Sequence, residues 1–138
     1  MSHWAKYSAD VMSSMEMPIL KQALEEMGIT LDETVKHLSD SFGDADVDAA
    51  FIKDGHQMNL GMNFEEVGRV RGKMHHKVTV NGDFWNTGLD EQMFCRTLSQ
   101  IYMKINAQAK LKLQGWTVTK VETDTEGKVH IRAARRAA

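Results

Sequence analysis

The run that most resembles a phosphate-binding loop lies between Gly68 and Met74 and reads Gly-Arg-Val-Arg-Gly-Lys-Met. A Walker-type loop has one more residue between its glycines, and a Ser or Thr after the lysine to hold Mg²⁺. Met74 occupies that last position here. The run also precedes an expected strand, so no helix N-terminus would face a phosphate. This segment therefore does not predict nucleotide hydrolysis.

Three aspartates have the spacing that opens a calcium-binding loop, namely Asp44, Asp46 and Asp48. The sixth position of such a loop requires glycine, and the twelfth requires a bidentate glutamate. Ala49 and Gly55 occupy these two positions. We therefore expect the aspartates to lie on the solvent side of a strand edge, where charge discourages edge pairing.

The six histidines do not form a metal-binding pattern. No two of them have the i, i+4 spacing of a helical metal pair, and no cysteine pair accompanies them. His75 and His76 are adjacent in an expected strand, so they point to opposite faces. A role for His3 stays open. The sequence predicts no metal and no cofactor.

Cys95 is the only cysteine, so no internal disulfide can form. It lies within a helical pattern, where a packed thiol is the simplest interpretation. A nucleophilic thiol would need an electropositive setting, which the sequence does not display. The chain also lacks a Gly-x-Ser-x-Gly elbow and a dinucleotide fingerprint. We therefore expect no catalytic residues and no enzyme, with a redox role for Cys95 as a remaining alternative.

The composition excludes several classes of protein. The 138 residues are 42% hydrophobic and 26% charged, a balance that is unlike collagen, disulfide scaffolds or disordered chains. No apolar run approaches the ~18 residues of a membrane span, and no secretory signal follows Met1. With a single cysteine, this predicts no membrane partner and a reducing compartment, either the cytoplasm or one like the plastid stroma.

The net charge of −2 conceals two oppositely charged halves. Residues 1–66 carry a net −9, and residues 67–138 carry a net +7. Either the halves interleave and their fields cancel, or a basic face meets an acidic partner, a nucleic acid or a second copy. Eight cations of the second half are the candidate partner-binding residues: Arg69, Arg71, Lys73, Lys77, Lys110, Lys112, Arg132 and Arg135.

Hydrophobic periodicity predicts an α+β fold, with a mostly antiparallel sheet of about six to seven strands and two helices on one face. The whole chain, 1–138, is expected to be a single domain, with 135–138 as a frayed tail. Strands are expected at 3–11, 30–37, 47–52, 57–64, 74–80, 116–121 and 129–133. One helix should begin at Ser13 or Ser14 and stop before Gly28, and another should run from Thr87 or Asp90 to Gly115.

Residues 57–64 alternate polar and apolar without a fault, which predicts a half-buried strand. Asp54-Gly55 and Asn81-Gly82 are both typical of tight hairpin turns. Residues 24–30 and 111–117 each combine a helix end, a glycine and a strand start. Two β-α-β-β units forming one sheet are therefore one possible organisation.

The order of residues along nearly the whole chain resembles the uncharacterised family of hypothetical chloroplast reading frame thirty-five. The segments that carry the resemblance are Met1-Ser2-His3-Trp4, Leu20 to Gly28, Phe84-Trp85, Gln100-Ile101-Tyr102, Leu111 to Val118 and Glu126 to Arg132. The resemblance implies no assigned activity, catalytic residue or cofactor. Bacterial genes of the family often lie beside an AAA-type ATPase and a small ferredoxin-like protein, which suggests an accessory subunit or adaptor. The chain departs from the family in its acidic segment at 39–48 and in its ten methionines.

The leading hypothesis is a non-catalytic binding or adaptor module that docks on a protein partner, with an AAA-type ATPase as a candidate. The alternative is a small nucleic-acid-binding domain that uses the same basic residues, with Trp85 or Trp116 as a stacking platform. The overall acidic balance, with a pI near 6.3, argues against nucleic acid. The oligomeric state stays open.

Overall fold

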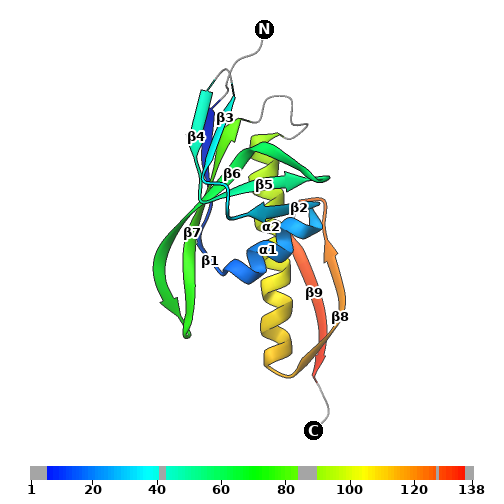
Figure 1. Cartoon of the computed structure of the whole chain (residues 1–138). Helices are drawn as coiled ribbons and strands as arrows, with labels where there is room; N and C mark the ends of the chain where they lie inside the picture. Colours follow the sequence, from blue (N-terminus) through cyan, green and yellow to red (C-terminus); the bar gives the residue numbers. More distant parts are fainter. Residues whose placement is uncertain (1–5, 41–42, 84–89, 127, 136–138) are drawn as a thin grey trace.

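A computed structural model describes residues 6–40, 43–83, 90–126 and 128–135 (Figure 1). His3, Trp85, Thr87 and most of the expected tail, 136–138, lie outside the described residues. The elements follow the chain as β1 (Lys6–Met15), α1 (Met17–Glu26), β2 (Ile29–Asp32), β3 (His37–Asp40), β4 (Gly43–Asp46), β5 (Ala49–Lys53), β6 (His56–Val70), β7 (Lys73–Asp83), α2 (Glu91–Leu113), β8 (Trp116–Thr123) and β9 (Val129–Arg135). The predicted α+β class with a mostly antiparallel sheet is confirmed.

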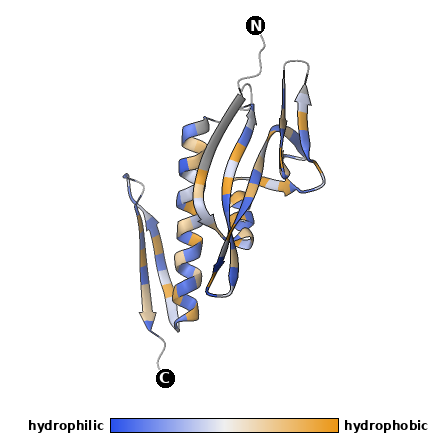
Figure 2. Ribbon diagram, turned by 90° about the vertical axis from the view of Figure 1, so that its left-hand side faces the viewer, coloured by the Kyte–Doolittle hydropathy of each residue, from blue (hydrophilic) through white to orange (hydrophobic). Residues whose placement is uncertain are grey.

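The main sheet has five strands in the order β1-β7-β6-β5-β2, and every neighbouring pair is antiparallel. It is narrower than expected, because β3–β4 and β8–β9 form separate two-stranded ribbons. The two β-α-β-β units therefore do not merge into one sheet. The 23-residue α2 rises roughly 34 Å, and the chain returns as a ribbon on the side of α2 that faces away from the sheet (Figures 1 and 2).

Both helices cover the same face of the sheet and share its core. The helices contribute Leu20, Leu24, Phe94, Leu98 and Tyr102, and the sheet contributes Met15, Phe51, Leu60, Met62, Val78 and Val80. The apolar side of 57–64 faces the core as predicted, because Leu60 and Met62 are fully buried while Met58 and Phe64 pack at the margin. The other side is not fully solvent-exposed, because Gly61 is buried against Val47 and Ala49. The hydroxyl of Ser99 on α2 also donates to the carbonyl of Val11 on β1.

The β3–β4 ribbon packs on the opposite face of the sheet, where β3 contacts β6 and β4 contacts β7. Leu38, Val47 and Ala50 form a second small core there, while the next residue of β5, Phe51, faces the main core. Among the three aspartates of this region, Asp44 and Asp46 are solvent-exposed on β4, as expected. Asp48 differs, because its carboxylate accepts a hydrogen bond from the Phe64 amide at 2.7 Å.

The first helix begins later than expected, at Met17 rather than after Ser13 or Ser14. The cause is the length of β1, whose last residue, Met15, still lies opposite His76 of β7. Pro18 occupies the first turn of the helix, where a missing N–H is tolerated. The second helix begins as predicted, because the carboxylate of Asp90 caps it by accepting from the amide of Met93.

One predicted turn is confirmed and the other is wrong. Asp54 and Gly55 both have positive φ and form the β5–β6 turn. Asn81-Gly82 forms no turn, since β7 continues to Asp83 and Gly82 pairs with strands on both sides. The β6–β7 turn is Arg71-Gly72, which lies in the run that resembled a phosphate-binding loop and leads into a strand.

None of the helices in the described ranges is both long enough and apolar enough to cross a membrane.

Candidate binding site

The eight candidate cations lie in separate parts of the fold. The end of the β6–β7 hairpin carries Arg69, Arg71 and Lys73, and β7 carries Lys77 further along. The last turn of α2 carries Lys110 and Lys112, and β9 carries Arg132 and Arg135. The structure brings three of them together in one cavity, namely Arg71, Lys73 and Lys110. Lys112 lines a different groove, between α1 and α2, and β9 lies beyond α2 (Figure 2).

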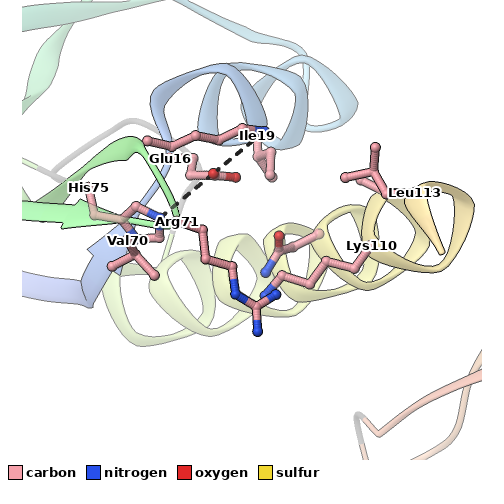
Figure 3. A pocket seen from close by; sticks show the side chains of 10 residues that line it. Glu16, Ile19, Val70, Arg71, His75, Lys110 and Leu113 are labelled. Carbon is pink, nitrogen blue, oxygen red and sulfur yellow. Dashed lines mark ion pairs between the residues drawn. The ribbon is translucent and has the colours of Figure 1, made fainter.

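The cavity that joins the three cations has a volume of about 350 Å³. The β6–β7 hairpin, the first turn of α1 and the C-terminal half of α2 form its walls. Figure 3 shows the long side chains of Arg71 and Lys110 reaching toward each other from the hairpin and the helix. Long segments of sequence separate these residues, so the site exists only in the folded chain, where the hairpin and the helix flank the same cavity.

Apolar side chains separate the cations in the cavity wall. Ile19, Val70 and Leu113 line the cavity together with the small side chain of Ala109. Val70 is 49% exposed and Leu113 is 80% exposed, so they are among the most exposed large hydrophobic residues of the described chain. The cavity therefore offers a bound molecule both positive charge and apolar surface.

One carboxylate, that of Glu16, lies in the cavity wall among these cations. Its side chain is only 15% exposed, and its Oε1 lies 3.7 Å from Nε2 of His75 and 3.9 Å from Nζ of Lys73. On the other side of the imidazole, Nδ1 of His75 lies 2.6 Å from Oγ of Ser14. These contacts fix the imidazole between β1 and the helix start.

Tyr102 of α2 positions the backbone of Glu16. The amide of Glu16 donates to the phenolic oxygen of Tyr102 at 2.7 Å, across 86 residues of sequence. Burial raises the pKa of Tyr102, since the phenolate would be poorly solvated there. The contact ties α2 to the junction of β1 and α1, which is also one wall of the cavity.

Ser14, His75 and Glu16 follow the order of nucleophile, base and carboxylate found in hydrolase triads. The geometry favours a structural role. The 3.7 Å between His75 and Glu16 exceeds a hydrogen bond, and Ser14 does not line the cavity, so its hydroxyl is not presented to a bound molecule. The cluster places the side chains of Glu16 and His75 in the cavity wall, where they can interact with a bound charged molecule.

Cys95 lies half-buried against the main core. Burial raises the pKa of its thiol, because the thiolate loses solvation. This environment disfavours the reactive form. Within the described ranges, no group of three or more His, Cys, Asp and Glu side chains is placed to hold a metal ion.

Sequence reasoning found the three cations of the cavity but missed Ser14, Glu16, Ile19 and Leu113. The hydrogen bonds of Ser14 and Glu16 join segments 61 and 86 residues apart, and Ile19 and Leu113 meet only at the cavity, so no local spacing could reveal them. No family model, curated protein or solved structure matches the chain. Function is therefore inferred from the cavity itself.

Proposed function

We propose that the chain is a non-catalytic binding module that docks an acidic protein partner in the cavity between the β6–β7 hairpin and α2. The observation that carries this proposal is the convergence of Arg71, Lys73 and Lys110 on one cavity with accessible apolar walls. Protein interfaces combine apolar contact with charge complementarity in this way.

The charges of the cavity favour an anionic ligand. Three cations outnumber the one carboxylate, Glu16, that lies among them. The N-terminus of α1, which has no side-chain cap, adds partial positive charge on the same side. Charges in a partly enclosed cavity also interact more strongly than charges in open water. The five remaining candidate cations would steer an acidic partner from a distance rather than contact it in the cavity.

The resemblance to the family of hypothetical chloroplast reading frame thirty-five supports an AAA-type ATPase as the partner, with this chain as its accessory subunit. The single Cys95, which forms no internal disulfide, supports a reducing compartment such as the cytoplasm or a plastid stroma.

Nucleic acid is the less favoured ligand. Binding of single strands combines cations with aromatic side chains on which bases stack. Trp116 begins β8 and does not line the cavity that gathers the cations. The aliphatic walls of that cavity suit a protein side chain better than a base.

Affinity purification from lysate of the source cells, with and without nuclease, tests the proposal. The cavity variant Arg71→Glu/Lys73→Glu/Lys110→Glu should lose a stoichiometric protein that survives nuclease. The control variant Lys112→Glu/Arg132→Glu/Arg135→Glu changes the net charge equally outside the cavity and should keep that protein. Retention of the partner by the cavity variant would refute the proposal, and loss of the partner on nuclease treatment would favour nucleic acid.

A further inference from the structure

We infer that the cavity recognises a short acidic segment whose carboxylates lie next to a large aliphatic side chain, and that Glu16 competes with this ligand for the cations. The inference rests on the proposed function and specifies the chemistry of its partner.

The aliphatic requirement follows from the way apolar and charged residues alternate around the cavity. Val70 immediately precedes Arg71 on the hairpin, and Leu113 lies three residues after Lys110, on the same face of α2. Each of these cations thus has an exposed aliphatic neighbour. A ligand with carboxylates alone would leave both apolar side chains in water, while a neighbouring aliphatic side chain would cover them.

The size of the cavity limits the ligand to a short segment. Its volume of about 350 Å³ lies near the lower end of the range of roughly 300–1,000 Å³ that is usual for ligand pockets. A few side chains of an extended peptide fit such a space. The charge of the cavity selects an acidic peptide from among the extended peptides that could enter.

Glu16 is the residue that competes with the ligand for the cations of the cavity. Its carboxylate already faces Lys73 and His75 within 4 Å, so an incoming carboxylate meets a partly neutralised cation and a like charge. Replacing Glu16 by Gln removes the charge and keeps both the size and the backbone amide that donates to Tyr102. Loss of one such charge interaction should tighten binding by about two- to fivefold.

The test is selection from a displayed library of random twelve-residue peptides on the wild-type protein, read by sequencing. The expected result is enrichment of Asp or Glu within three positions of Leu, Ile, Val or Met. The most enriched peptide is then synthesised, and its affinity is measured for wild type and for Glu16→Gln, Lys110→Glu and Lys112→Glu. Lys110 and Lys112 both lie in the last turn of α2, so the two reversals disturb the helix equally while only Lys110 lines the cavity.

We expect Lys110→Glu to weaken binding at least tenfold, Lys112→Glu to change it less than twofold, and Glu16→Gln to strengthen it. Replacing the acids of the peptide by amides, or its aliphatic residues by Ser, should each abolish binding. If Glu16→Gln lowers stability, Lys73→Met tests the same ion pair from its other side and should weaken binding.

Selected peptides without acids or without aliphatic residues, or an absence of enrichment, would overturn the inference. So would equal weakening by Lys110→Glu and Lys112→Glu, or displacement of the peptide by an equal concentration of a single-stranded oligonucleotide. Weaker binding of the peptide to the Glu16→Gln variant would refute the inference that Glu16 competes with the ligand for the cations. These outcomes leave the proposed function standing if the variant Arg71→Glu/Lys73→Glu/Lys110→Glu still loses the cellular partner. In that case only the inferred chemistry of the ligand is wrong.

Discussion

Glu16 is the residue at which three parts of the molecule meet. Its amide donates to Tyr102 on α2, its carboxylate faces Lys73 and His75 on β7, and it is the N-cap residue of α1. Nothing in the local sequence distinguishes it from other glutamates. The cations of the cavity were predictable because they stand out as charges, whereas the role of Glu16 depends on distant packing.

The hydroxyl of Tyr102 provides a test of this junction. Tyr102→Phe removes the acceptor of the Glu16 amide and leaves a part-buried donor unsatisfied, which should destabilise the fold by about 1–3 kcal/mol. Urea denaturation followed by circular dichroism measures the loss. The exposed neighbour Met103 serves as a control, since Met103→Leu should change stability by less than about 0.5 kcal/mol. An unchanged midpoint for Tyr102→Phe would mean that the hydrogen bond contributes nothing to the junction.

At the scale of elements, most strands and both helices were predictable because their signals are local. The apolar side of 57–64, the cap at Asp90 and the glycines that end the helices, Gly28 and Gly115, all correspond to observed features. The single strand predicted at 30–37 is wrong, since β2 ends at Asp32 and the separate ribbon of β3 and β4 follows from His37. The other failures concern which strands pair. Asn81-Gly82 has the composition of a turn, yet β7 continues through it because β1 and β6 pair with it on both sides. Such pairing depends on residues far away in sequence.

Gly82 is required within the sheet rather than in a turn. Its φ is +134°, and a Cβ there would clash with the carbonyl oxygen of Asn59, so the sheet needs glycine for close approach. Gly68 has a similar φ of +127° but open space around it. Gly68→Ala should cost about 1–3 kcal/mol from backbone strain alone. Gly82→Ala should cost about 1–3 kcal/mol more because of overpacking.

Thermal and urea denaturation of the two variants measure the difference. Since the backbone strain is shared, the comparison isolates the clash with β6. Equal destabilisation by Gly68→Ala and Gly82→Ala would show that β6 shifts to accommodate the added methyl group. Glycine would then be required at position 82 only because of its positive φ.

At the scale of the whole molecule, the oppositely charged halves of the sequence interleave. β1 comes from the acidic half and pairs with β7, which comes from the basic half. The cavity itself combines Glu16 from the first half with Arg71 and Lys110 from the second. Charge counting along the chain could predict that basic residues were available, but it could not predict which of them share a surface.

The fold also divides into a sheet-and-helix body and the β8–β9 ribbon, and hydrogen exchange should separate them. No residue of β8 or β9 in the described ranges is fully buried, and none belongs to the main core. Two-stranded ribbons are marginally stable alone. Amides of the ribbon should therefore exchange at least about 100-fold faster than those of Val78 and Val80 on the doubly paired β7.

Hydrogen exchange followed by NMR provides this comparison, under conditions where closing is fast and the opening equilibrium determines the exchange rate. Val78 and Val80 should exchange with the free energy of global unfolding, and their protection should fall in the Tyr102→Phe variant while that of the ribbon stays unchanged. Equal protection of β7 and the ribbon would mean that α2 transmits the stability of the core to its outer side. In that case β9, with Arg132 and Arg135, would be held as rigidly as the cavity.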